Sequence, residues 1–175
     1  FNSVTARTAG FSTYSLGEFS NAGLLAMIFL MFVGASPGST GGGIKTSTLF
    51  ALIQGIKTAA TNTSGKAFHY SVPHGVFRKA SVIAVMGISV IAVGTFMLCA
   101  FEPDIAIRDA LFEMTSAFGT VGLTTGITTG LCTASKLTSI VMMYIGRLGP
   151  LTIATLWYFT NGDRIKYPDG NIAIG

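Results

Sequence analysis

Two short stretches of this chain have residue types that can place several backbone carbonyls around one alkali cation. We call them the first filter segment, Thr8-Ala9-Gly10-Phe11, and the second filter segment, Thr120-Val121-Gly122-Leu123. A dehydrated cation needs oxygen ligands in place of its lost water, and the carbonyls of an extended, glycine-containing strand can supply them. Glycine permits backbone geometries in which successive carbonyls point the same way. Both segments are therefore candidate ion-binding sites.

The two segments belong to an internal repeat with an offset of 112 residues. Without a gap, the same offset pairs Thr13 with Thr125 and Gly34 with Gly146. Glycine pairs carry more weight than apolar pairs, because glycine marks special backbone geometry. Repeats within one chain are a common way to build a transport site. Two copies, each followed by an apolar helix, favour a filter over two ordinary glycine-containing turns.

A glycine-rich loop (residues 36–43) interrupts the apolar stretch that follows the first filter segment. Its residues are Ser36, Pro37, Gly38, Ser39, Thr40, Gly41, Gly42 and Gly43. Proline and repeated glycine oppose helix continuation, so we expect a returning helix over residues 21–60 that is broken inside the membrane. Non-helical backbone at that depth must face protein or a water-filled cavity. A phosphate-binding loop is disfavoured, because Ile44 separates the last glycine from Lys45.

Arg147 is the second residue expected below the filter. In the repeat it aligns with Ala35, beside the glycine-rich loop. An arginine inside a membrane is costly unless it faces water or a partner. We interpret it as a positive charge in the pore that forms a gate with the loop, and the alternative is a structural salt bridge or carbonyl cap. Lys45 lies nearer the cytoplasm, and Glu113 is a candidate partner for Arg7.

Apolar helices must position these residues. Half of the chain is hydrophobic, only 10% is charged, and residues 19–44 and 80–100 contain no charge. Uncharged runs of this length fit a bilayer core of about 30 Å, which about 20 helical residues cross. The net charge of +4 is divided between loops rather than gathered on one face, so no nucleic-acid partner is expected. The two cysteines have no disulfide or metal-site spacing.

We expect an all-α membrane protein built of helix–pore-loop–helix repeats of the potassium-channel-like type. Residues 1–60 form a repeat from its filter onward, 61–79 a linker, 80–160 a complete repeat and 161–175 a tail. The complete repeat has an outer helix (80–101), a half-helix (105–117) whose negative end aims at the ion, and a returning helix (134–159). The linker and tail carry basic residues and are assigned to the cytoplasm by the positive-inside rule, on the basis of Lys57, Lys66, Arg78, Lys79, Arg164 and Lys166.

The chain resembles the Trk/Ktr/HKT superfamily of cation transporters, specifically the membrane subunit of the bacterial Ktr type. The resemblance covers nearly the whole chain and rests on residues 2–11, 34–46, 115–123 and 146–152. It implies four repeats around one pore, of which this chain holds the third from its filter onward and all of the fourth. It also implies a homodimer in the lipid of the bacterial inner membrane, seated on a cytoplasmic nucleotide-binding regulatory ring.

The expected function is potassium uptake through the filter, gated by the glycine-rich loop, Arg147 and the regulatory subunit. K⁺ is the one metal expected, at the filter only, and no covalently bound cofactor or enzymatic activity is expected. Any nucleotide is expected on the partner subunit. The alternative is a sodium-conducting member of the superfamily, because a filter loop upstream of this chain could carry serine. A nucleotide-binding membrane ATPase and a membrane scaffold without flux are disfavoured by the broken phosphate-loop motif and by Arg147.

Overall fold

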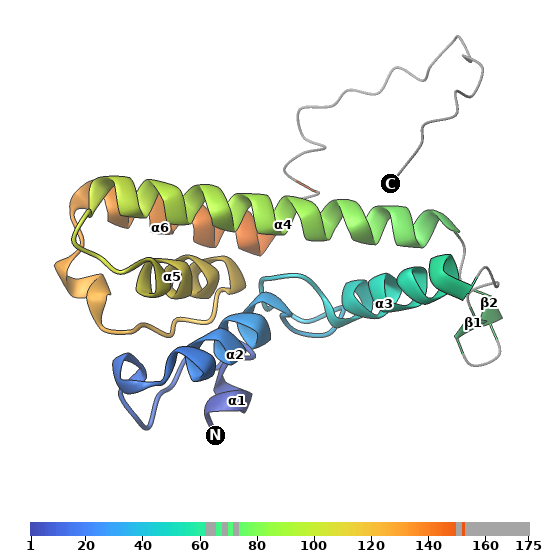
Figure 1. Cartoon of the computed structure of the whole chain (residues 1–175), viewed down its shortest axis with the longest axis horizontal. Helices are drawn as coiled ribbons and strands as arrows, with labels where there is room; N and C mark the ends of the chain where they lie inside the picture. The colour runs from blue at the N-terminus through green and yellow to red at the C-terminus, as the bar shows by residue number, and fades with distance from the viewer. Residues whose placement is uncertain (62–65, 68–69, 72–73, 150–151, 153–175) are drawn as a thin grey trace, which may run out of the picture.

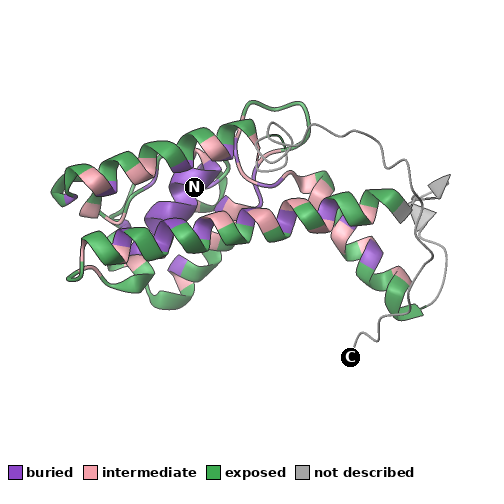
Figure 2. Cartoon of the chain, turned by 90° about the horizontal axis from the view of Figure 1, so that it is seen from above, coloured by how far each residue is buried: buried purple, intermediate pink, exposed green. Residues whose placement is uncertain are grey.

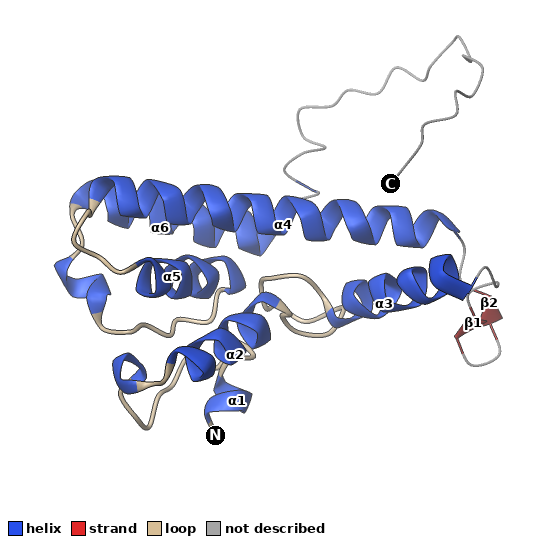
Figure 3. Ribbon diagram, viewed as in Figure 1, coloured by secondary structure: helices blue, strands red, loops and turns tan. Residues whose placement is uncertain are grey.

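The computed structural model describes residues 1–61, 66–67, 70–71, 74–149 and 152 of the 175-residue chain. This part is helical apart from one small hairpin (Figure 3). The helices are α1 (Asn2–Thr5), α2 (Asn21–Phe32), α3 (Thr46–Thr61), α4 (His74–Phe101), α5 (Ile107–Gly119) and α6 (Thr133–Leu148), with 3-10 turns at Leu16–Glu18 and Ile127–Gly130. The hairpin pairs β1 (Lys66–Ala67) with antiparallel β2 (Tyr70–Ser71). The all-α prediction omits this hairpin, which lies in the predicted linker.

α4 is the one described helix that is long and apolar enough to cross a membrane. It begins at His74, whereas the prediction began the helix at residue 80. The predicted boundary followed the charges of Arg78 and Lys79. Arginine and lysine are good helix formers, however, so charge alone does not end a helix. The first turns of α4 therefore take in the last residues of the predicted linker.

α5 lies between α2 on one side and α4 and α6 on the other, and it contacts all three (Figure 1). All residues from 112 to 119 are buried, and Figure 2 shows the buried positions gathered in the half of the molecule that contains α5. One core cluster joins α5 to α2, to the second filter segment and to residues on either side of the first, through Ala6, Leu16, Leu24, Met27, Met31, Phe112, Val121 and Leu123. A second cluster joins it to α4 and α6 through Ile91, Leu98, Ala110, Met114, Ala117, Phe118, Leu131 and Met142.

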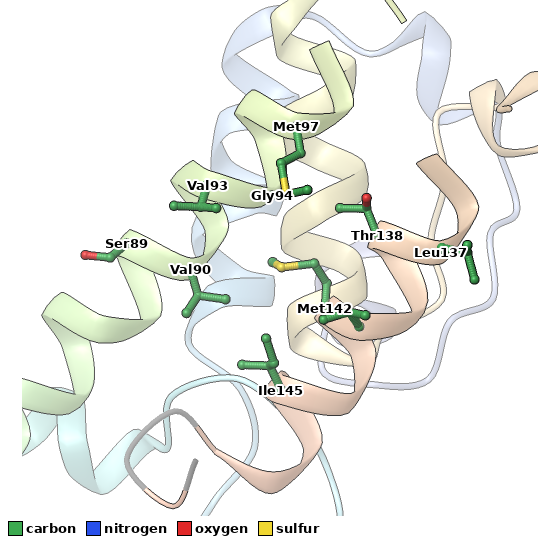
Figure 4. Close-up of a pocket in the computed structure, with 10 residues that line it drawn as sticks. Ser89, Val90, Val93, Gly94, Met97, Leu137, Thr138, Met142 and Ile145 are labelled. Carbon is green, nitrogen blue, oxygen red and sulfur yellow. The ribbon is translucent and has the colours of Figure 1, made fainter. Parts of the chain in front are cut away.

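Glycines on α4 let neighbouring helices approach closely. A Cβ at Gly94 would lie 2.9 Å from the Met142 sulfur on α6, and the two residues face one another across the α4–α6 groove (Figure 4). A Cβ at Gly87 would lie 3.3 Å from the Phe32 ring and 3.4 Å from the Phe118 ring. Small residues at helix interfaces are typical of membrane proteins, where close backbone packing drives association.

Non-helical backbone separates α2 from α3 within the stretch predicted as one broken helix. The ends of this backbone are held together, because Gly34 N–H donates to Ile44 O at 2.8 Å and Ile44 N–H donates to Phe32 O at 3.1 Å. Val33 and Ile44 form a parallel β-bridge. The glycine-rich loop therefore leaves and re-enters the fold at nearly the same place.

α6 ends earlier than predicted. The prediction extended this returning helix to residue 159, but α6 stops at Leu148 and Gly149 has a φ of 85°. Glycine at positive φ followed by proline is a helix-ending signal that the apolar pattern concealed. The predicted aromatic anchors and the tail at 161–175 lie outside the described residues. α5 begins and ends two residues later than the predicted half-helix, so Phe118 and Gly119 belong to the helix.

Candidate ion filter and gate

The two filter segments share an unusual backbone conformation. Thr8 and Gly10 have φ of 76°, while Thr120 and Gly122 have φ of 53° and 88°. Thr8 and Thr120 are the two described non-glycine residues with positive φ. This conformation is a genuine outlier for a β-branched residue and costs about 1–3 kcal/mol, and such strain concentrates at functional sites. Alternating signs of φ turn successive peptide groups to the same side of the chain.

The two filter segments lie against one another although 112 residues separate them. A Cβ at Gly10 would lie 2.3 Å from the Val121 carbonyl oxygen and 3.8 Å from the Gly122 Cα. The structure therefore brings together the glycine of one predicted segment and the carbonyls of the other. No side chain fits between them, so glycine is required at position 10 for this approach.

The buried Thr5 holds the first filter segment through its hydroxyl and its carbonyl, which accepts from the N–H groups of Ala9 and Gly10. Thr5, at the end of α1, is 2% exposed. Its Oγ1 donates to the Phe11 carbonyl at 2.6 Å and accepts from the Phe11 N–H at 2.8 Å. This pair of hydrogen bonds closes the backbone around Thr8, Ala9 and Gly10. Sequence reasoning did not identify Thr5, because a threonine two residues before an arginine gives no distinctive signal.

A buried carboxylate contacts the residues that follow the second filter segment. Glu113, on α5, is 8% exposed, and it accepts a hydrogen bond from the Thr124 hydroxyl. Thr128 Oγ1 lies 3.2 Å from both Glu113 carboxylate oxygens. The suggested Arg7–Glu113 pair is wrong: within the described part of the chain, the ion pair present joins Arg108 to Asp109 at 3.5 Å.

The glycine-rich loop reaches both filter threonines. A Cβ at Gly41 would lie 2.9 Å from the Thr8 methyl carbon, and a Cβ at Gly42 would lie 2.9 Å from the Thr120 methyl carbon. Gly42 N–H also donates to Thr120 Oγ1 at 2.9 Å. Gly42 is buried and Gly41 and Gly43 are half-buried, whereas residues 36–40 are exposed. The glycine end of the loop thus lies directly on the filter segments.

Lys45 binds the loop that precedes it. Its Nζ donates to the Ser39 carbonyl at 3.3 Å and to the Gly41 carbonyl. The sequence suggested only that Lys45 lies nearer the cytoplasm, and the missed signal was a cation two residues after the end of a glycine-rich loop. The ammonium group turns back to the loop, so its charge lies close to the filter.

Arg147 lies in the last turn of α6 and its side chain is exposed. Among the described residues it forms no hydrogen bond or ion pair. Thus Lys45 contacts the loop directly, whereas Arg147 does not. No group of three or more His, Cys, Asp or Glu side chains within the described ranges could hold a metal, so the oxygens offered at the filter are backbone carbonyls and threonine hydroxyls.

Comparison with curated proteins relates the chain to bacterial potassium uptake proteins. It is 36% identical to Ktr system potassium uptake protein B of Bacillus subtilis (strain 168) and 38% identical to the protein of that name from Vibrio alginolyticus. It is 37% identical to potassium/sodium uptake protein NtpJ of Enterococcus hirae. These matches cover 100% of this chain and 39%, 38% and 40% of the relatives. The chain thus spans about two fifths of their length, and these relatives are transport proteins rather than enzymes.

The fold has a counterpart among solved structures. The crystal structure of the potassium transporter TrkH from Vibrio parahaemolyticus superposes with a TM-score of 0.71 and 22% identity, over 89% of this chain and 35% of that chain. At this identity the likeness supports the fold alone. Residues 1–165 match the TrkH family, described as cation transport protein. Together with the span of α4, this match indicates a membrane protein. The chain belongs to the TrkH family of cation transport proteins.

Proposed function

We propose that this chain supplies two of four filter-bearing repeats in a potassium uptake transporter. The observation that carries the proposal is the backbone shared by the two filter segments, which have positive φ at both Thr8 and Gly10 and at both Thr120 and Gly122. Because the segments also touch at Gly10 and Val121, their carbonyls can contribute to one ring of oxygen ligands. Potassium uptake by the Ktr relatives agrees with this chemistry.

The ion is held by carbonyls of residues 8–11 and 120–123, with further repeats completing the ring. α5 ends at Gly119, directly before the second filter segment. The C-terminal end of a helix carries a partial negative charge, which stabilises a nearby cation. A dehydrated K⁺ thus finds oxygen ligands and a favourable field in the same place, as in pore-loop filters.

The gate consists of the glycine-rich loop, with Lys45 and Arg147 as its cationic residues. Gly41 and Gly42 lie against Thr8 and Thr120, which supports a position of the loop across the path from the filter. Lys45 holds the loop in this position through the carbonyls of Ser39 and Gly41. A positive charge here repels K⁺ in a poorly screened cavity, so the loop must move before the ion passes.

The full-length protein works as a homodimer in the bacterial inner membrane, on a cytoplasmic nucleotide-binding regulatory ring. The linker faces the cytoplasm in this arrangement, and the nucleotide belongs to the ring. Cysteine crosslinking tests the orientation, with Cys99 and Cys132 first replaced by serine. Thr61→Cys, at the exposed end of α3, crosslinks to the ring, and Asp104→Cys on the other side does not. The reverse result contradicts this topology.

The filter is tested in the full-length protein by Gly10→Ser and Gly122→Ser. A side chain at either position obstructs or redirects the carbonyls, so potassium preference falls. Rubidium and sodium uptake are measured in cells that lack other potassium systems. The matched control is Gly130→Ser, because a Cβ at Gly130 meets nothing within 4 Å and its φ is ordinary. An unchanged potassium-to-sodium ratio in both filter variants contradicts the filter assignment.

The second candidate is a transporter that also carries sodium. The name of NtpJ, potassium/sodium uptake protein, is the observation that favours it. The same uptake assay separates the candidates in the unmodified protein. Rubidium uptake that excess sodium does not reduce supports a potassium-selective filter, whereas sodium uptake at a comparable rate supports the second candidate.

A further inference from the structure

Glu113 is a buried acid that neither the filter carbonyls nor the gate employ. It lies on α5, seven residues before Thr120, and is 8% exposed. A buried carboxylate costs free energy unless hydrogen bonds satisfy its oxygens. An apolar or neutral residue would suffice if this position served packing alone. The acid therefore needs an explanation in terms of what it binds.

All of its hydrogen-bond partners follow the second filter segment. The Thr124 hydroxyl donates to Oε1, and Thr128 Oγ1 lies 3.2 Å from both Oε1 and Oε2. Thr124 Oγ1 in turn accepts from Gly126 N–H at 2.9 Å. Thr128 Oγ1 lies 2.7 Å from Thr124 Oγ1. The carboxylate thus joins Thr124, Gly126 and Thr128 in one network.

This network shares a wall with the filter. A cavity of about 400 Å³ is lined by Glu113, Thr124 and Thr128 together with Thr120, Val121 and Gly122. Thr124 directly follows Leu123, the last residue of the filter segment. α5 fixes the inner end of the segment at Thr120, and Glu113 on the same helix fixes the outer end. The second filter segment is therefore attached to α5 at both of its ends, directly at Thr120 and through Glu113 at Thr124.

The first filter segment has no equivalent of this device. The repeat places Phe1, Ser12 and Leu16 at the positions of Glu113, Thr124 and Thr128. Ser12 Oγ bonds locally to Tyr14 O. Within the described chain the carboxylate network thus belongs to the second filter segment, and the aligned positions at the first segment carry no acid.

We propose that Glu113 is a positioning residue that fixes the outer end of the second filter segment and thereby sets how strictly the pore prefers potassium to sodium. The proposal rests on the proposed function. Sodium is smaller than potassium and needs ligand oxygens closer to the ion. A filter strand released from Glu113 can move inward around sodium, whereas an anchored strand keeps the wider spacing that suits potassium.

The test uses the full-length transporter with Glu113→Gln and, separately, with Thr124 and Thr128 both changed to Val. The glutamine keeps the side-chain length but removes the charge and one acceptor oxygen. The two valines keep the shape of threonine and remove the hydroxyls. Glu102→Gln is the control, since it removes another hydrogen-bonded carboxylate that does not touch residues 124–128. Rubidium uptake, sodium uptake and protein yield are measured together.

Both variants should lower the rubidium-to-sodium uptake ratio by roughly tenfold, the scale of one lost hydrogen bond to a charged group. The control should keep the ratio of the unmodified protein. A purely structural role predicts reduced yield with an unchanged ratio in the protein that is made, and that result overturns the proposal. If Glu113→Gln does not accumulate, the ratio of the double valine variant decides. Absence of rubidium uptake by the unmodified transporter overturns the proposed function itself.

Discussion

The two filter segments have the same backbone but different supports. Both have positive φ at the threonine and at the glycine. Phe11, however, is 73% exposed in this chain and Leu123 is 3% exposed. One hydroxyl from Thr5 closes the first segment, whereas the carboxylate of Glu113 and the α5 core hold the second. The two segments thus share one backbone conformation, whereas the side chains that hold it differ between the repeats.

A second pair of residues that the repeat aligns also has different surroundings in the two repeats. Gly34 and Gly146 are equivalent in the repeat, and each leaves no room for a side chain. A Cβ at Gly34 would lie 2.1 Å from the Gly42 carbonyl, in the glycine-rich loop. A Cβ at Gly146 would lie 1.9 Å from the Phe118 carbonyl, at the buried end of α5. The same residue thus packs against the glycine-rich loop in one repeat and against the core in the other.

The largest expected effect comes from Gly146→Ala. The added methyl overlaps the backbone of a buried helix that contacts three neighbours, and overpacking of this kind costs about 1–3 kcal/mol. The thermal midpoint and yield of the purified full-length protein should both fall. Gly34→Ala should leave them nearly unchanged and raise rubidium uptake without the regulatory subunit, because the displaced group is a loop. Equal loss of stability in the two variants would remove the distinction between gate and core.

The next largest effect is an expected difference in rubidium uptake between Gly10→Ala and Gly122→Ala. Both impose about 1–2 kcal/mol of left-handed backbone strain on alanine. Only at position 10 does the methyl also meet a carbonyl, that of Val121 at 2.3 Å, since a Cβ at Gly122 meets nothing within 4 Å. Rubidium uptake per molecule should therefore fall more in Gly10→Ala. The reverse order would mean that the contact between the two segments does not hold in the assembled pore.

Sequence alone predicted the features that rest on local rules. The uncharged run gave most of α4, and the Thr-x-Gly pattern marked both filter segments, because glycine and long apolar runs impose strong local constraints. The end of α6 at Leu148 was missed although Gly149-Pro150 signalled it. The partners of Glu113 and the contact of Gly42 with Thr120 were not predictable. They depend on side chains that only the tertiary fold brings together.

A smaller effect concerns the hydrogen bonds by which Lys45 holds the glycine-rich loop. Lys45→Met removes the hydrogen bonds to Ser39 and Gly41 and keeps the length of an unbranched apolar chain. Closure of the loop is weakened, so rubidium uptake without the regulatory subunit should rise several-fold at normal yield. Lys57→Met is the control, because Lys57 is exposed on α3 and its side chain has no bond to the loop among the described residues. Rubidium uptake that stays at the unmodified level in Lys45→Met would exclude a role of Lys45 in holding the loop closed.

Arg147→Ala tests whether the second cation belongs to the same gate. If Arg147 is part of the barrier, Arg147→Ala raises rubidium uptake per molecule, as Lys45→Met does. A structural pair with a residue outside the described chain predicts the opposite, since breaking a buried ion pair destabilises the fold and lowers the yield. Measuring yield and uptake together therefore assigns Arg147 to the gate or to the scaffold.

The smallest effect compares the starts of the two returning helices. Ser20 caps α2 by accepting from Gly23 N–H at 3.2 Å, whereas at α6 the Glu102 carboxylate accepts from Cys132 N–H at 2.6 Å. This backbone bond, with smaller contributions from Ser135 and Lys136, lowers the pKa of Glu102 below its ordinary value of 4.5. A lowered pKa in the folded state means that the carboxylate stabilises the fold above the ordinary value. That stabilisation is lost as the pH falls through the lowered pKa.

The two caps should therefore respond differently to acid. Ser20→Ala removes a neutral cap, which costs about 0.5–2 kcal/mol, and its effect on the thermal midpoint should be the same at neutral and acidic pH. Glu102→Gln should lower the midpoint slightly at neutral pH, because the side chain is partly exposed and solvent screens its charge. The difference from the unmodified protein should shrink below pH 4.5, the ordinary pKa, and vanish below the lowered one. A Glu102→Gln difference that persists unchanged into acid would show that the hydrogen bond, and not the charge, holds the start of α6.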